Sequence, residues 1–177
     1  AEGASSVVYD TPITMSDFSS WGVPGTLEMK PEITAPGGNI YSVNGLIAGG
    51  TSYENMSGTS MATPQVAGMV ALVAQYIRES GLTQKTGLTP RVLAQSLLMS
   101  TAVPQLEDWG EEGDGYYPVL RQGVGLANVS KAIAADSYIL MGADANQSYA
   151  DGKVKVELGD DPARTGDYTF SFSIHNL

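Results

Sequence analysis

One short segment of the sequence carries a residue type and spacing that could perform nucleophilic chemistry. Gly58-Thr59-Ser60 stands at the start of a long apolar run, so Ser60 is expected in the first turn of a helix. The first N–H groups of a helix lack intrahelical acceptors and carry the positive end of the helix dipole, which stabilises an oxyanion forming nearby. Ser60 is therefore a candidate nucleophile.

Position alone leaves another interpretation open. Serine and threonine are favoured helix N-caps, so Thr59 or Ser60 could serve only as a cap, and by position this interpretation is the stronger one. The nucleophile elbow of the α/β-hydrolases needs a glycine two residues after the serine. Ala62 occupies that position and no apolar strand precedes the turn, so the sequence excludes an elbow.

The element that must position Ser60 is predicted to be one long helix. It begins at or just before Ser60, runs to about Glu79 and is ended by Gly81. Pro64 is expected in its first turn, where a missing N–H costs little. No charged residue occurs between Ser60 and Arg78, whereas a surface helix normally shows a polar face. We therefore expect this helix to be buried nearly all round.

Caps and alternation predict the other elements. Thr89 and Pro90 are typical of an N-cap and a first helical position, so a second helix is expected there, and a short helix is expected at 127–135. Period-two alternation of apolar and polar residues after Ser137 predicts half-buried strands. The predicted strands are 6–9, 40–43, 138–141, 153–158 and 168–174.

Composition excludes several classes of function. Nine Lys and Arg against 19 Asp and Glu give a net charge of −10, which argues against nucleic-acid binding. The absence of Cys excludes disulfides and thiolate metal sites, and no apolar run approaches the roughly 18 residues of a membrane span. The acidic residues within 107–114 are expected to lack a basic partner and to form a solvated loop in preference to a Ca²⁺ site. No metal or cofactor is expected.

Five segments, in order along the chain, resemble the subtilisin-like serine proteases (subtilases). The most specific is Gly58-Thr59-Ser60-Met61-Ala62-Thr63-Pro64-Gln65-Val66-Ala67-Gly68, which resembles the nucleophile motif of that family. The other segments are 18–22, 30–37, 100–102 and 122–128, so the resemblance covers residues 18 to about 135. Trp21, Pro31-Glu32-Ile33 and 37–40 look most like the lactocepin and C5a-peptidase group of Gram-positive cell-envelope proteases.

The resemblance implies a fold and a location. We expect an α/β fold in which residues 1–136 are the C-terminal part of a subtilisin-like parallel-sheet domain containing the buried nucleophile helix. Residues 137–177 are expected to begin a β-sandwich domain of the fibronectin-III type. A protein of this kind is expected to be secreted or attached to the cell wall, and to hydrolyse peptide bonds of protein or peptide substrates.

The resemblance also implies that catalytic groups lie outside the sequence. Subtilases order their triad Asp, His, Ser, but no His precedes Ser60, and the one His, His175, is two residues from the end. Asn39, Asn44 and Asn55 do not match the position of the family's oxyanion Asn. The chain is therefore expected to be a fragment, inactive alone, whose partner is the missing N-terminal part of its own domain.

Two functional hypotheses follow. In the first, Ser60 attacks the scissile carbonyl, its backbone N–H binds the oxyanion, and the Thr59 hydroxyl supports that site. In the second, the parent is a pseudo-protease or a binding or scaffold module of a cell-surface protein. Upstream Asp and His residues in subtilase contexts would favour the enzyme. The fragment, with an apolar helix left uncovered, is expected to self-associate.

Overall fold

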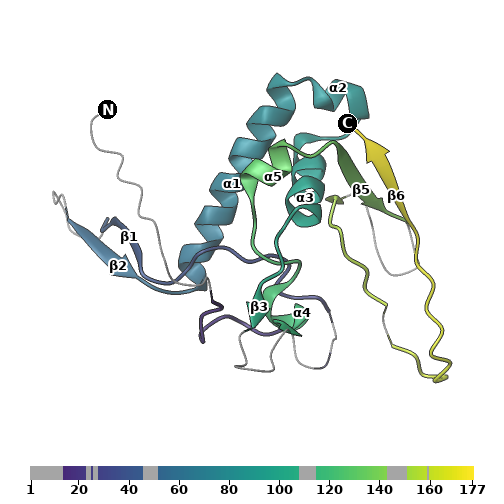
Figure 1. Ribbon diagram of the computed structural model, residues 1–177, viewed down its shortest axis with the longest axis horizontal. Helices are drawn as coiled ribbons and strands as arrows, with labels where there is room; N and C mark the ends of the chain where they lie inside the picture. Colours follow the sequence, from purple (N-terminus) through teal and green to yellow (C-terminus); the bar gives the residue numbers. More distant parts are fainter. Residues whose placement is uncertain are drawn as a thin grey trace.

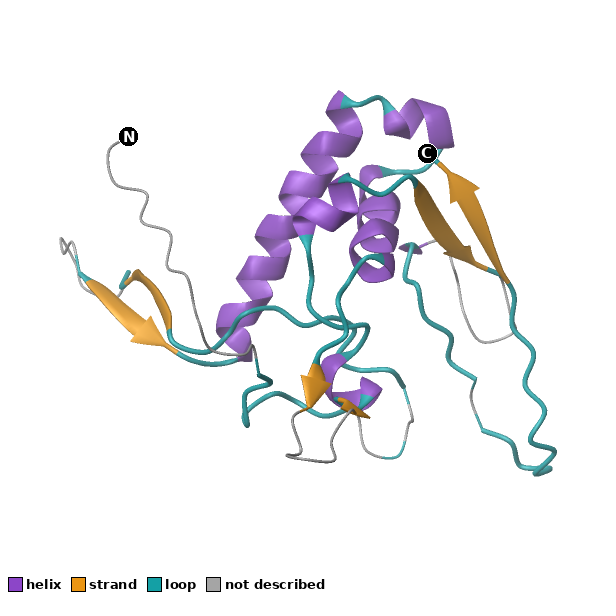
Figure 2. Ribbon diagram, viewed as in Figure 1, coloured by secondary structure: helices purple, strands orange, loops and turns teal. Residues whose placement is uncertain are grey.

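A computed structural model describes residues 14–22, 25, 28–45, 52–107, 115–142, 151–158 and 160–177 (Figures 1 and 2). The predicted strand 6–9 and the acidic residues after Glu107 lie outside the described residues. The helices are α1 (Thr59–Glu79), α2 (Leu82–Thr86), α3 (Pro90–Ser100), α4 (Val119–Gln122) and α5 (Val129–Ile133). The strands are β1 (Ile40–Val43), β2 (Tyr53–Met56), β3 (Leu106–Glu107), β4 (Gly115–Tyr116), β5 (Ser137–Met141) and β6 (Phe172–Asn176).

Helix α1 has the predicted bounds, but the expected place of Pro64 is wrong. The helix ends at Glu79, and Gly81 follows it in the left-handed conformation with φ 71°. Pro64 lies within the helix, one turn further along than its first turn. Because proline has no N–H, it cannot donate to the carbonyl four residues earlier, which is that of Ser60.

The core is formed where α1, α3, α5 and β5 meet. In Figure 1, α1 and α3 stand side by side, and the β5–β6 pair lies on the opposite side of α3. Thr89 caps α3 as predicted, since its side chain accepts a hydrogen bond from the N–H of Val92. The buried residues of this core are Val73, Ile77, Leu82, Leu93, Ala94, Leu97, Leu98, Ala132 and Tyr138.

The expectation that α1 is buried nearly all round is wrong for this chain. Only Val73 and Ile77 of the helix are buried, whereas Leu72 is 56% exposed. The physical reason is that α3 and α5 supply most of its lateral contacts. Two neighbouring helices cover only part of a helical cylinder, so one side of α1 stays open.

The expected parallel sheet is not found among the described residues, which form three two-stranded antiparallel sheets, β1–β2, β3–β4 and β5–β6. One isolated parallel bridge joins Thr34 to Leu126. The N–H of Thr34 donates to the carbonyl of Gly125 at 2.9 Å, and its carbonyl accepts from Ala127 at 2.9 Å. Before Leu126, Gly123 and Gly125 both have positive φ and depart from the extended path of a strand, and after it the chain enters α5.

The strands predicted after Ser137 are confirmed only in part. Strand β5 matches the first, β6 covers the end of the third, and residues 153–158 are described without strand pairing. Strand β5 also packs on α3, because the buried Ser96 hydroxyl donates to the carbonyl of Ile139 at 2.7 Å and accepts from its N–H at 3.2 Å.

None of the described helices has the length and hydropathy needed to cross a membrane.

Candidate nucleophile site

Ser60 is the second residue of α1, directly after the turn that leaves β2. Its side chain is exposed, and within the described part of the chain its hydroxyl makes no hydrogen bond. The helix begins at Thr59 with Gly58 as its N-cap, and no side chain caps it. Capping therefore does not account for Thr59 or Ser60, and the cap interpretation is wrong.

The surroundings of Ser60 suit an oxyanion. The first turn of α1 contains no acidic residue. The carbonyl of Gly58 accepts from the N–H groups of Met61 at 3.0 Å and Ala62 at 3.4 Å, so helical hydrogen bonding starts just after Ser60. The N–H groups of Thr59 and Ser60 precede that first bond and carry the positive end of the helix dipole.

The segment 32–39 holds the turn before Ser60 in place. The N–H of Gly58 donates to the carbonyl of Gly37 at 2.8 Å, and the N–H of Asn39 donates to the hydroxyl of Ser57 at 2.8 Å. A Cβ on Gly37 would lie 2.8 Å from the carbonyl oxygen of Gly58, which is too close for any other residue. Glycine at position 37 is therefore required for this contact.

The segment 122–128 is hydrogen-bonded to the same segment. The N–H of Val124 donates to the carbonyl of Glu32 at 3.0 Å. Gly123 has φ 63°, and a Cβ there would lie 2.4 Å from the carbonyl carbon of Glu32. The buried amide of Gln122 donates to the carbonyl of Tyr117 at 2.6 Å and fixes the start of this turn.

The segment 18–22 is held by α4. The N–H of Gly22 donates to the carbonyl of Leu120 at 2.8 Å, and the Arg121 guanidinium lies 5.6 Å from the centre of the Trp21 ring. Arg121 also lies 3.5 Å from the carboxylate of Glu107. The expectation that the acidic loop has no basic partner is thus wrong for Glu107, because the fold brings a distant arginine to it.

A groove of about 980 Å³ lies between these segments and α1. Residues 31–38 form one wall, and Ala62, Thr63 and Val66 are among the α1 residues that form the other. Thr59 lines the groove, whereas Ser60 does not. The two candidate site residues therefore lie next to each other at the helix start, with one facing the groove.

The structure does not bring His175 to Ser60. His175 lies on β6, where its ring stacks on Tyr138 at 5.0 Å and its Nε2 is 2.7 Å from the hydroxyl of Ser173. Strand β6 pairs with β5, which packs on α3, and α3 in turn packs on α1 (Figure 1). This arrangement agrees with the prediction that His175 is not a base for Ser60.

Comparison with known proteins shows the family to which this chain belongs. Residues 6–149 match the subtilase family of peptidases (Peptidase_S8), so the chain belongs to the subtilase family, and its α/β fold class follows from that membership. A PII-type proteinase of Lactococcus lactis subsp. cremoris is 39% identical over 127 residues, which are 68% of this chain and 6% of that protein. The C5a peptidase of Streptococcus pyogenes is 35% identical over 128 residues, which are 71% of this chain and 10% of that protein.

Among solved structures, the patellamide maturation protease PatA is similar, with 34% sequence identity and a TM-score of 0.38. The match covers 58% of this chain and 32% of that one. The chain thus spans a tenth or less of the length of the proteinase and the C5a peptidase that it matches.

Proposed function

We propose that this chain supplies the nucleophile of a serine endopeptidase. In this mechanism the Ser60 Oγ attacks the scissile carbonyl while a His from outside this sequence takes its proton. The N–H of Ser60 binds the oxyanion, with the Thr59 hydroxyl in support, and the amine leaves with the proton. Water then hydrolyses the acyl-enzyme and regenerates Ser60. The observation that carries the proposal is the exposed, uncapped Ser60 at the start of α1, within the subtilase match.

The proposal also states that the isolated chain has no peptidase activity. No His precedes Ser60, and His175 is held elsewhere by Tyr138 and Ser173. Without a general base the Ser60 hydroxyl stays protonated near neutral pH. The Asp, the His and the oxyanion Asn come, in this proposal, from the N-terminal part of the same catalytic domain, which is also the partner that covers the open side of α1.

Location and domain organisation complete the proposal. The protein is secreted or attached to the cell wall and acts on protein or peptide substrates. Residues 1–136 belong to the catalytic domain and residues 137–177 begin a β-sandwich of the fibronectin-III type, which is supported by the antiparallel pairing of β5 with β6. The hydrogen bonds between Ser96 and Ile139 attach β5, the first strand of this second domain, to α3 of the catalytic domain.

The test is a Ser60→Ala variant in a protein that joins this chain to the residues supplying the Asp and His. Peptide hydrolysis should fall by about 10⁶-fold, and labelling by a serine-directed fluorophosphonate should disappear. Ser130→Ala is the matched control, because Ser130 is exposed on α5, and it should keep full activity. Hydrolysis by the Ser60→Ala variant at the unaltered rate would refute the assignment, and inactivity of the unaltered protein would favour a scaffold.

A further inference from the structure

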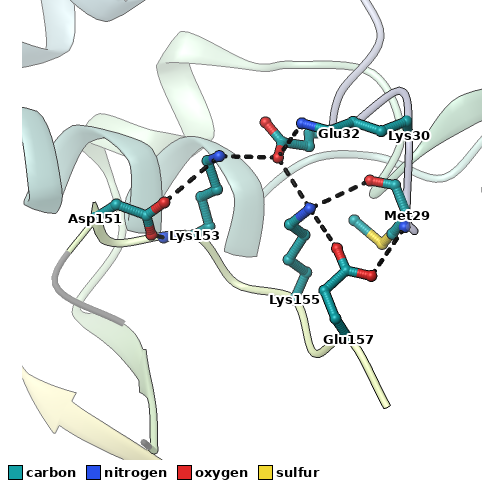
Figure 3. A network of polar contacts seen from close by, with 7 residues as sticks. All are labelled: Met29, Lys30, Glu32, Asp151, Lys153, Lys155 and Glu157. Carbon is teal, nitrogen blue, oxygen red and sulfur yellow. Dashed lines mark hydrogen bonds and ion pairs between the residues drawn. The ribbon is translucent and has the colours of Figure 1, made fainter. Parts of the chain in front are cut away.

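A cluster of six charged side chains joins two segments that are far apart in the sequence (Figure 3). We call it the charged clasp, and it consists of Lys30, Glu32, Asp151, Lys153, Lys155 and Glu157. Three lysine ammonium groups converge on the Oε1 atom of Glu32. The distances are 2.8 Å for Lys30, 3.0 Å for Lys153 and 3.1 Å for Lys155.

The clasp is balanced in charge and partly withdrawn from solvent. Its three lysines face three carboxylates, and the side chain of Lys155 is only 8% exposed. Burial alone would raise the pKa of Glu32, but hydrogen bonds from Lys30, Lys153 and Lys155 outweigh it and lower that pKa from 4.5 to about 2. Ion pairs of this kind differ from exposed surface pairs, because removal of one partner leaves a charge without compensation.

The segment 151–158 is also held at both of its ends. Gly152 is buried at φ 80°, and a Cβ there would lie 2.0 Å from the carbonyl oxygen of Val92 in the first turn of α3. At the other end, the N–H of Met29 donates to the Oε2 of Glu157 at 3.2 Å. The segment therefore lies against the catalytic part at two places, with Lys153 and Lys155 between them.

A short stretch of backbone leads from the clasp to the turn before the nucleophile. Glu32 begins the segment whose carbonyl at Gly37 accepts from the N–H of Gly58, two residues before Ser60. Between them, Thr34 is bonded to Gly125 and, through its hydroxyl, to the carbonyl of Gln122 at 2.9 Å. The segment is thus anchored at Glu32, at Thr34 and at Gly37, and loss of the anchor at Glu32 leaves one constraint fewer on the Gly37–Gly58 contact.

We infer that Lys153 and Lys155 act through Glu32 as positioning residues for the turn that carries Ser60. Residues 151–158 then contribute to catalysis, although they lie after α5, the last helix of the chain's described part. The inference rests on the proposed function, since it assigns a role in hydrolysis. A small misplacement of a reacting group can cost about a hundredfold in rate, so a modest loss of order at Gly58 is sufficient.

The test compares clasp variants with a control of the same residue types, in the protein that joins this chain to the triad Asp and His. The clasp variants are Glu32→Gln and the double variant Lys153→Met, Lys155→Met; the control is Lys85→Met with Lys131→Met, two exposed lysines. Assays are run well below the Tm of each variant. Both clasp variants should lose about tenfold to a hundredfold in kcat with KM changed less than about threefold, while the control keeps its kcat.

A combined variant and a second readout separate positioning from general stabilisation. If the lysines act through Glu32, the variant with all three substitutions should have the kcat of Glu32→Gln alone. Hydrogen exchange of the Gly58 N–H should accelerate by about tenfold in the clasp variants, while the N–H of Leu97 in α3 exchanges at its original rate.

The outcomes that overturn the inference are distinct from those that overturn the proposed function. When the unaltered protein is active, an unchanged kcat in the clasp variants overturns the inference whatever the exchange rates. Equal acceleration at Gly58 and Leu97 also overturns it, because the clasp would then only stabilise the fold. If the unaltered protein hydrolyses no peptide, the proposed function fails, and selective exchange at Gly58 decides whether the clasp orders the turn.

Discussion

The stability contributed by Glu32 should depend on pH in a predictable window. The pKa of this carboxyl is lowered from 4.5 to about 2 in the folded chain, because hydrogen bonds from three lysines outweigh the effect of burial. A carboxylate with a depressed folded pKa stabilises the fold fully above its unfolded pKa. That contribution should therefore be complete above pH 4.5 and should be lost as the pH falls toward 2.

The contribution of Glu32 to the free energy of unfolding follows from its pKa in the folded and in the unfolded chain. The difference between these two pKa values converts to about 3–4 kcal/mol at about 1.4 kcal/mol per pH unit. The Glu32 side chain is 22% exposed and that of Lys30 is 40% exposed, so solvent screening reduces the net contribution to about 1–2 kcal/mol. The Glu32→Gln variant removes the charge and nearly preserves the shape of the side chain.

The assay is urea unfolding of the unaltered chain and Glu32→Gln across a pH series at fixed protein concentration. The unaltered chain should be more stable by about 1–2 kcal/mol at pH 7, and the difference should shrink as the pH falls from 4.5 toward 2. Carboxyl groups outside the charged clasp contribute equally to both proteins and cancel in the comparison. A difference that stays constant across this window, or one that grows at low pH, would refute the reasoning.

Three further predictions test the core, the glycine contact and the open side of α1. Leu97→Ala should cost about 2–5 kcal/mol in urea unfolding, because Leu97 is fully buried, and a cost below 1 kcal/mol would contradict the described core. Gly123→Ala should destabilise more than Gly166→Ala by at least about 1 kcal/mol, since both have positive φ but only position 123 faces backbone within 2.4 Å; equal losses would count against the contact. The isolated chain should self-associate at micromolar concentration through the open side of α1, and Leu72→Gln should weaken that association in sedimentation velocity; a monomer at all concentrations would contradict this.

Local signals in the sequence were sufficient for α1, α3 and α5, whereas the short helices α2 and α4 were not predicted. Gly81 after Glu79 and the Thr89-Pro90 pair mark the end of α1 and the start of α3, because each signal acts within one turn of the chain. Ser60 was predicted at the start of a helix for the same reason. The sequence could not show that one side of α1 is open, because burial depends on which elements pack against it.

Contacts between distant segments could not be predicted. The alternation in 153–158 predicted a strand, but Lys153 and Lys155 bind Glu32, more than a hundred residues earlier, and no strand in the described part of the chain pairs with them. The alternation did contain a usable signal. Positions 153, 155 and 157 share one face of an extended segment and all carry charge, so the charged face was visible in the sequence although its partner segment was not.

The hydroxyl of Ser96 determines the direction in which the β5–β6 sheet can grow. It occupies both the N–H and the carbonyl of Ile139, so it substitutes there for a neighbouring strand and closes the outer edge of β5. Among the described residues, the edge without a strand partner belongs to β6, where Phe172 and Ile174 expose 56% and 63% of their surface on one face. If the proposed β-sandwich is built on this strand pair, its further strands would add beyond β6 and its second layer would cover Phe172 and Ile174, with α3 at the border of the sheet.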